Sequence, residues 1–300
     1  GKLRIEDRWI NTQLNHLITN VTKLMEDYQF GEAERQIYDF IWSQFCDWYI
    51  EIAKIRLRPH PTLSIDGEGL GEVSPLPFLV NTLEISLRLL HPFMPFITEE
   101  LWQSLLRAER GNLVFRFARA DSYQLSAGSS LMIAPYPVAD SKAIDPEAER
   151  VMDSMIEIIR SIRNARAQYK VVSSKWIEAQ VYADDLLLHI TAQAKTIESL
   201  GHARPLTILP RDRRETDKEA LVMVLKETEV VLPWAGMIEP LAEKQRLMKE
   251  REVTQAKIAQ LDARLADSAF LTKAPPHVIE KEKQKLDMLK DKLKRLHQEL

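Results

Sequence analysis

The sequence predicts a mainly α-helical protein in three parts: an antiparallel helical bundle, a small α/β module and a carboxyl-terminal antiparallel coiled-coil hairpin. Three patterns lead to this prediction. Apolar residues recur every three or four positions in the first 110 residues, alternate with polar ones near residue 180, and return as heptad leucines at the end. Only nine of the 300 residues are glycine, which argues against a glycine-rich β-sandwich. We expect domains at residues 1–145, 146–238 and 239–300.

Four helical segments predict the bundle. The first carries an apolar stripe at helical spacing, formed by Ile10, Leu14, Leu17, Val21, Leu24 and Tyr28. The second follows a turn at 29–31, and its aromatic inner face is expected to hold Ile37, Phe40, Ile41, Phe45, Trp48 and Ile52. After a loop at 58–77, a third helix is expected at about 78–91 and a fourth from Thr98. One long and two short connections are typical of an antiparallel bundle.

The middle of the chain predicts a small α/β module. Asp145 as a cap and Pro146 in the first turn indicate the start of a helix. Its apolar face is expected to contain Val151, Met155, Ile158, Ile162, Ala165 and Tyr169. A strand, a helix, a second strand and a hairpin should follow at Trp176–Ala183, 184–200, Leu206–Leu209, and Leu221–Leu225 with Val230–Leu232. A further short strand is expected at Val114–Phe117.

From about residue 239 the pattern changes to that of a coiled coil. Apolar residues up to Leu265 precede a break at Asp267-Ser268, and Pro275-Pro276 ends the connecting loop. Heptad spacing then places leucines at 286, 289, 293, 296 and 300. Two helices of about 25 residues predict a hairpin roughly 35–40 Å long.

Charge is unevenly distributed along the chain. The net charge is −3, yet residues 241–300 hold fourteen Lys and Arg against ten Asp and Glu, a balance of +4 that leaves −7 for the rest. Local cationic stripes decide affinity for RNA, because each phosphate contact is local.

Two cationic stripes supply the candidate RNA-binding residues. A helical wheel places the first away from the apolar stripe of its helix, and no acid lies between Ile158 and Lys170. The candidates are Arg160, Arg163, Arg166 and Lys170 on this helix, and Arg264, Lys273, Lys281 and Lys285 on the hairpin. An ordinary solvated helix face is the alternative interpretation.

Catalytic motifs are missing from these 300 residues. Neither Gly-x-x-x-x-Gly-Lys-Ser/Thr nor Gly-x-Gly-x-x-Gly occurs, and no histidines have the His-Glu-x-x-His spacing. The single cysteine, Cys46, is interpreted as a buried spacer between aromatic residues and not as a nucleophile. We therefore expect no catalytic residue, metal or cofactor in this chain. No run of about 18 uncharged apolar residues occurs, so no membrane contact is expected.

Several strings resemble the class I tRNA synthetases of the valine, isoleucine and leucine group. Asp7-Arg8-Trp9-Ile10 is similar to the opening of their anticodon-binding domain, and the twelve residues from His91 to Trp102 are the strongest match. Similar to the valine enzymes in particular are Tyr28–Ala33, Ile37–Phe40 and Phe45–Glu51. The segment from Ala269 to Glu282 resembles the hinge of the carboxyl-terminal arm of bacterial-type valine enzymes.

The resemblance covers nearly the whole chain and implies the carboxyl-terminal portion of a valine–tRNA ligase. Such enzymes attach valine to tRNA(Val) using ATP and edit misacylated threonine in upstream domains, so catalysis and ATP are expected outside this chain. The bundle is expected to contact the anticodon stem and loop, and the arm the outer corner of the tRNA. A cytoplasmic monomer that binds no DNA is implied. The stretch from Asn112 to Ser130 departs from the family pattern as a longer, polar insertion.

Two other functions remain as alternatives. A stand-alone helical scaffold would use the hairpin for protein–protein pairing and bind no RNA. Salt-dependent binding of valine tRNA separates this scaffold from an RNA-binding chain. An independent enzyme is disfavoured, because no nucleophile, base or metal set converges in the sequence.

Overall fold

The computed structural model describes residues 3–57, 74–111, 130–214, 219–237 and 240–266, together with 281–293 except residues 283, 287 and 292. The predicted mainly α architecture with a small sheet is confirmed. The expected strand at Val114–Phe117 and most of the loop at 58–77 lie outside the described residues.

The chain divides into two compact units. One comprises Gly1–Asn164, Ala179–Glu215 and Val222–Val231. The other comprises Ala165–Glu178, Thr216–Leu221 and Leu232–Leu300. The domain limits expected after residues 145 and 238 stay predictions.

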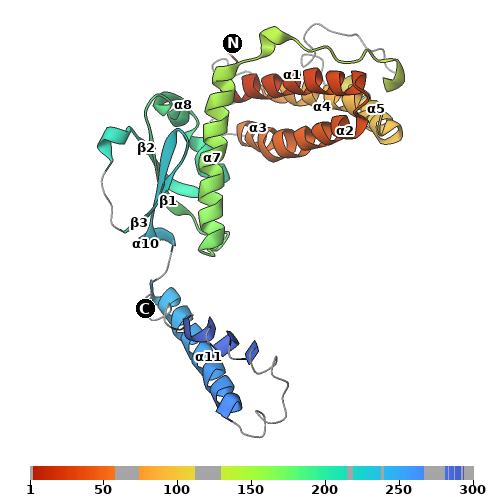
Figure 1. The fold of residues 1–300 in the computed structure, drawn as a ribbon. Coiled ribbons are helices and arrows are strands. Elements are labelled where there is room, and N and C mark those ends of the chain that lie inside the picture. The colour runs from red at the N-terminus through yellow and green to blue at the C-terminus, as the bar shows by residue number, and fades with distance from the viewer. Residues whose placement is uncertain are drawn as a thin grey trace. The chain divides into compact units, whose positions relative to one another are not determined.

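The bundle is built from four helical rods (Figure 1). They are α1 (Ile5–Glu26), the run of α2 (Phe30–Asp39), π-helix η1 (Phe40–Ile50) and α3 (Glu51–Leu57), α4 (Leu76–Leu90), and α5 (Pro95–Gly111). We call the run from α2 to α3 the second rod. The fourth helix begins at Pro95, earlier than the predicted Thr98, because the fixed φ of proline suits the first turn of a helix.

The apolar stripe predicted for the first helix is confirmed from Ile10 to Val21, which are buried. Tyr28 is wrongly included in that stripe. Because α1 ends at Glu26, Tyr28 lies beyond the helix with a φ of 59° and is 81% exposed. The bundle core also contains the fully buried Trp102 and Tyr49.

α7 (Pro146–Gln168) begins where the sequence predicts. The backbone N–H of Ala148 donates to Asp145 Oδ1 at 3.0 Å, so Asp145 caps the first turn. Arg8 of α1 pairs with the same carboxylate at 2.6 Å. The predicted apolar face of α7 is buried from Val151 to Ala165.

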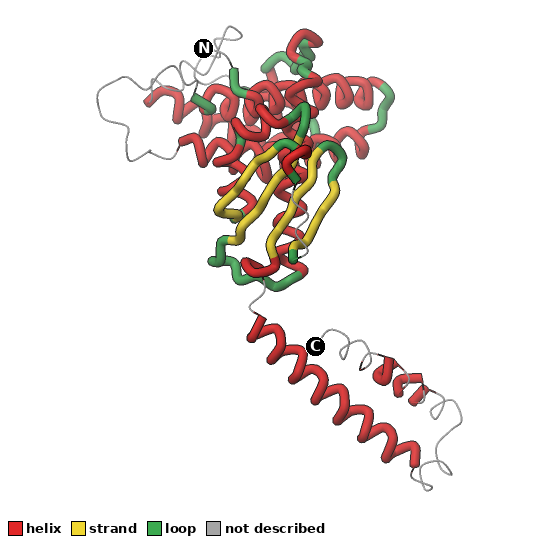
Figure 2. The backbone as a smooth tube through the Cα atoms, turned by 90° about the vertical axis from the view of Figure 1, so that its left-hand side faces the viewer, coloured by secondary structure: helices red, strands yellow, loops and turns green. Residues whose placement is uncertain are grey.

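Four strands form one sheet (Figure 2). Their order is β2 (Ala203–Leu209), β1 (Ile177–Ala183), β4 (Thr228–Pro233) and β3 (Ala220–Val224). β1 and β4 are antiparallel, with Gln180 opposite Val231. The predicted strands and the predicted hairpin of β3 and β4 are thereby confirmed.

The single helix predicted at 184–200 is wrong in one respect, because the structure has two helices there. α8 (Leu187–Ala192) and α9 (Ala194–Gly201) are separated at Gln193. The side chain of Gln193 donates from Nε2 to the buried carboxylate of Glu6 at 3.1 Å. This tertiary hydrogen bond accompanies the break, and the local sequence gives no sign of it.

The predicted hairpin at the end of the chain is confirmed over the described residues. α11 (Pro240–Ala266) is about 40 Å long at 1.5 Å per residue and ends just before the predicted break at Asp267. Helical residues resume within 281–293 and lie beside α11 (Figures 1 and 2). Lys290 Nζ reaches Asp262 Oδ1 at 3.4 Å, joining the two helices. None of the described helices is long and apolar enough to cross a lipid bilayer.

Candidate nucleic-acid interface

Exposed apolar side chains gather at the turns of the bundle. Tyr28 and Phe30 flank the turn between α1 and α2, with ring centroids 6.1 Å apart in an edge-to-face arrangement. Phe96, at the start of α5, is 90% exposed, and Met94 beside it is also exposed. In an up-and-down bundle the first and third turns lie at the same end. This end, which we call the turn platform, offers rings on which unpaired RNA bases could stack.

A second pair of exposed rings lies on the side of the second rod. Tyr38 and Trp42 are one helical turn apart, and their rings are nearly parallel, at 3° with centroids 6.3 Å apart. They are 61% and 58% exposed, although a tryptophan is usually mostly buried. Exposed aromatic rings can hold bases by stacking without reading their sequence.

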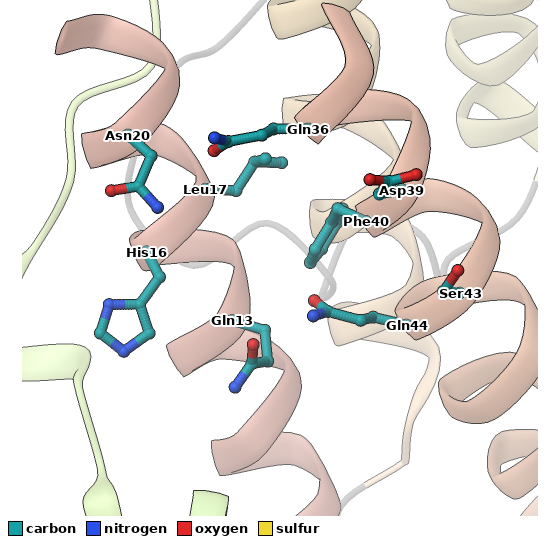
Figure 3. Close-up of a pocket in the computed structure, with 9 residues that line it drawn as sticks. All are labelled: Gln13, His16, Leu17, Asn20, Gln36, Asp39, Phe40, Ser43 and Gln44. Atoms are coloured by element: carbon teal, nitrogen blue, oxygen red, sulfur yellow. The ribbon is translucent and has the colours of Figure 1, made fainter. Parts of the chain in front are cut away.

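A polar groove of about 500 Å³ runs between α1 and the second rod (Figure 3). Its apolar floor is formed by Leu17 and Phe40, both of which are buried. Its walls are polar and carry Gln13, His16, Asn20, Gln36, Asp39, Ser43 and Gln44. No Lys or Arg is among the residues that line it, so the groove suits hydrogen-bonding groups better than phosphates.

Part of the groove wall is already held in place. Gln13 Nε2 donates to Glu149 Oε1 at 2.8 Å, and Gln36 Nε2 donates to Glu32 Oε1 at 3.0 Å. The pKa of Glu32 is lowered to about 2, chiefly by its hydrogen bonds from Arg35 and Gln36, so Glu32 stays charged and keeps the amide fixed. These contacts orient the two amides and leave their oxygens available as acceptors.

Arg160 and Arg163 are held against Trp48. Each guanidinium carbon lies 5.4 Å from the centre of the indole ring, within the range of a cation–π contact. Arg163 Nε also donates to the carbonyl oxygen of Leu200 at 2.7 Å. Partial burial lowers the pKa of Arg163, against the opposing charges of Glu51 and Asp47. The pair is therefore positioned by the fold, and acids from the second rod lie nearby.

The predicted cationic arc on α7 is corrected in two respects. Arg166 is only 8% exposed, and its guanidinium donates to the carbonyl oxygens of Lys175 and Val172 at 2.8 and 3.1 Å. It therefore secures the turn after α7, and burial lowers its pKa. Lys170 lies beyond the end of the helix at Gln168, with a φ of 52° that closes the helix. RNA contact by these residues stays a prediction, and we leave Arg166 out of the surface proposed below.

The candidate residues of the arm are exposed where the structure describes them. Arg264 on α11 and Lys281 lie on the surface, as does Lys285, whose Nζ pairs with Glu282 at 3.2 Å. Lys273 lies outside the described residues. A surface ion pair of this kind contributes little to stability, so Lys285 can exchange its partner for a phosphate.

A metal site is not assembled in the described ranges. There, no three His, Cys, Asp or Glu side chains lie where they could share a metal ion. Cys46 is half-buried, and this burial raises the pKa of its thiol, with Asp47 adding to the effect. A raised pKa reduces the thiolate that a nucleophile requires.

Comparison with known families separates the chain into two matched regions. Residues 7–182 match the family described as the anticodon-binding domain of tRNA ligase. The chain belongs to this family. Residues 241–300 match the family described as the valyl tRNA synthetase tRNA binding arm. tRNA is therefore the class of partner for both regions, which we call the anticodon-binding domain and the arm.

Proteins of similar sequence carry both regions. The chain is 42% identical over 297 residues to a valine–tRNA ligase of Dehalococcoides mccartyi, and 33% identical over 287 and 294 residues to those of Bacillus subtilis and Thermotoga maritima. These matches cover 99%, 95% and 98% of the chain but only 31%, 29% and 30% of the relatives. The predicted resemblance to valine–tRNA ligases is confirmed, and the chain spans about a third of their length.

Sequence reasoning missed the surface of the anticodon-binding domain that can hold bases. It treated Tyr28 as core, and it did not consider Tyr38, Trp42 or the groove. One signal was present: Tyr38 and Trp42 are four residues apart and fall outside the apolar stripe predicted for their helix. The groove had no comparable signal, because two separate helices build it.

Proposed function

We propose that the chain is the tRNA-binding part of a valine–tRNA ligase and holds tRNA(Val) at two places. The observation that carries this proposal is that one chain joins an anticodon-binding domain, residues 7–182, to a tRNA-binding arm, residues 241–300. The relatives that contain both regions are named valine–tRNA ligases, which supports tRNA(Val) as the particular tRNA.

The two places are suited to different contacts. On the anticodon-binding domain, the turn platform and the Tyr38–Trp42 pair supply rings for unstacked loop bases. On the arm, Arg264, Lys281 and Lys285 supply charges for the phosphate backbone, which fixes position without reading sequence. Arg160 and Arg163 add two positioned charges on α7.

The reaction of the whole protein is part of the proposal. We infer that it attaches valine to tRNA(Val) using ATP, and that ATP binds in a portion of the longer protein outside these 300 residues. The chain itself is inferred to bind no cofactor or metal, no DNA and no membrane. A cytoplasmic monomer fits an enzyme of protein synthesis.

A binding titration across a salt series tests the proposal. The 300-residue chain should bind a tRNA(Val) transcript, and its affinity should fall as salt rises, by roughly 0.7 to 0.9 in logarithmic slope for each phosphate contact. An unrelated RNA duplex of equal length is the control. Equal affinity for both RNAs with no salt dependence would contradict the proposal and favour a protein-pairing scaffold.

Catalysis by the isolated chain is tested separately. ATP–pyrophosphate exchange with valine should be undetectable when the 300-residue chain is the only protein present. Exchange that persists through purification would contradict the placement of the active site outside this chain.

A further inference from the structure

We propose that the polar groove between α1 and the second rod receives one unpaired RNA base and reads its hydrogen-bonding edge. This inference rests on the proposed function, since it assigns a second role within the same tRNA-binding surface. It differs from stacking on the exposed rings, which tolerates any base. The groove would instead distinguish one base from another.

The chemistry of the groove fits the edge of a base. An Asn or Gln amide offers a donor and an acceptor side by side, the same alternation that the edge of a base presents. The side-chain amides of Asn20 and Gln44 line the groove, and neither has a hydrogen-bond partner among the residues that the structure describes. Gln13 and Gln36 have their nitrogens occupied by glutamates, and so present oxygens in fixed positions.

The floor of the groove is apolar and rigid. Phe40 lies between Gln36 and Gln44, with Leu17 opposite it on α1 (Figure 3). Both side chains are buried, so they form a fixed apolar surface beneath the polar rim. A base held in the groove would therefore meet this apolar bottom only at its edge, and the amides of the walls would supply its hydrogen bonds.

The π-helix explains why the amides line up along one wall. In an α-helix, residues four apart differ in direction around the helix axis by about 40°, so the side chains of Gln36, Phe40 and Gln44 would spread over about 80°. From Phe40 to Ile50 the chain is a π-helix, whose hydrogen bonds join residues five apart and widen each turn. Because each residue of a π-helix turns through a smaller angle, the rotation around the helix axis from Phe40 to Gln44 is opposite to that from Gln36 to Phe40. Gln44 therefore points in nearly the same direction as Gln36.

The length of this π-helix favours a functional explanation. π-helices are rare, mostly occur as single turns and are often found at functional sites. Here the segment is eleven residues long and carries Phe40, Ser43 and Gln44 of the groove together with Trp42. The wider backbone therefore coincides with the part of the second rod that lines the groove.

The charges around the groove exclude the closest competing ligand, a phosphate group. Asp39 lies on the rim and its Oδ2 accepts from Arg35 Nη1 at 2.5 Å. His16 Nε2 lies 3.2 Å from Glu149 Oε1. None of the residues that line the groove is a Lys or Arg that could attract a phosphate, and the carboxylate of Asp39 would repel one.

The test is a double-mutant cycle on binding of tRNA(Val). The protein variants are Asn20→Ala and Gln44→Ala, with Asn81→Ala on α4 as a matched control because it removes a half-buried amide that does not line the groove. The RNA variants are tRNA(Val) transcripts in which one unpaired loop nucleotide at a time is made abasic. Each groove variant should bind the intact transcript about tenfold more weakly, and Asn81→Ala should bind it like the parent chain.

The cycle also identifies the base. With one abasic transcript, the groove variants and the parent chain should bind equally, because the partner of the amides has been removed. Groove variants that bind the intact transcript as tightly as the parent, or that lose the same factor with every abasic transcript, would overturn the inference. A parent chain that binds no tRNA would instead overturn the proposed function itself.

Discussion

At the scale of single residues, the start of α1 is organised around buried charge. Asp7 Oδ1 accepts from the hydroxyl of Tyr49 at 2.7 Å and from Arg56 Nη1 at 2.6 Å. Both Asp7 and its neighbour Glu6 are buried. Burial and the Asp7 charge raise the pKa of Tyr49, so its hydroxyl remains a donor. These hydrogen bonds offset the cost of removing the carboxylates from water and join α1 to the far end of the second rod.

Tyr49→Phe is expected to lower the free energy of unfolding by about 1–3 kcal/mol, because it leaves a buried carboxylate with one donor fewer. Urea unfolding followed by circular dichroism measures the change. Tyr38→Phe, which removes a hydroxyl from an exposed ring, is the matched control and should change the stability very little. Equal effects of both substitutions would show that the Asp7 hydrogen bond does not stabilise the bundle.

Glu99 should make stability depend on pH. Burial opposes its charged form, but hydrogen bonds from Gln103, the Leu131 N–H and Ser130 outweigh it and lower the pKa of Glu99. A lowered pKa in the folded state contributes stability above the unfolded pKa, and this contribution is lost as pH falls through the folded value. The urea concentration at the midpoint of unfolding should therefore decrease as the pH is lowered below 4.5.

Glu99→Gln should reduce this acid dependence, since no carboxylate remains to be protonated. Midpoints measured at pH 7 and at about pH 3 should differ less for Glu99→Gln than for the parent chain. Glu100→Gln is the control, because Glu100 is exposed and its ion pair with Arg107 lies on the surface. An unchanged pH dependence in Glu99→Gln would contradict the role assigned to this carboxylate.

At the scale of elements, hydrophobic periodicity predicted the helices well where one face is buried continuously. The stripe from Ile10 to Val21 and the apolar face of α7 are examples. Periodicity failed where the helix stops, as at Tyr28. The spacing of apolar residues continues into the turn, but the backbone is no longer helical there. It also could not show that α7 ends before Lys170.

The candidate site could be predicted only in part. Charge patterns located Arg160 and Arg163, but burial of Arg166 depends on carbonyl groups of the following turn, which no local pattern reveals. The π-helix was missed because apolar spacing is read against the α-helical period. The resemblance to a known family supplied the tRNA partner, which helical spacing alone could not.

The second rod should contribute to RNA binding through its exposed rings. Trp42→Ala is expected to weaken binding of tRNA(Val) about tenfold, because an aromatic ring that stacks on a base contributes about 1–3 kcal/mol. Fluorescence anisotropy with labelled tRNA(Val) measures the affinity. Trp42→Phe retains an aromatic face and should lose much less. A chain that binds equally well with alanine at this position would exclude the Tyr38–Trp42 pair from the interface.

At the scale of the whole molecule, the chain combines two tRNA-binding regions on one polypeptide. The second binding event becomes intramolecular once the first has formed, so modest affinities at each region can produce strong overall binding. Charge is distributed accordingly, with +4 on residues 241–300 and −7 on the remainder. We therefore expect salt to weaken the contacts of the arm more than those of the anticodon-binding domain.

Removal of charge from the arm should change the salt dependence measurably. The triple variant Arg264→Ala, Lys281→Ala, Lys285→Ala should lower the slope of log affinity against log salt by roughly 0.7 to 0.9 for each phosphate contact that is lost. Lys195→Ala, which removes an exposed lysine from α9, is the control and should leave the slope unchanged. A triple variant that keeps the slope of the parent would remove these three residues from the interface.

The thiol of Cys46 on η1 can report how often the bundle opens around it. Because the chain has no other cysteine, an alkylating reagent marks a single atom, and no engineered label is needed. Packing keeps that sulfur mostly protonated, so modification near neutral pH is slow and records the moments when the π-helix opens. The rate of alkylation, followed by mass spectrometry with and without RNA, therefore gauges how firmly a bound ligand closes the bundle.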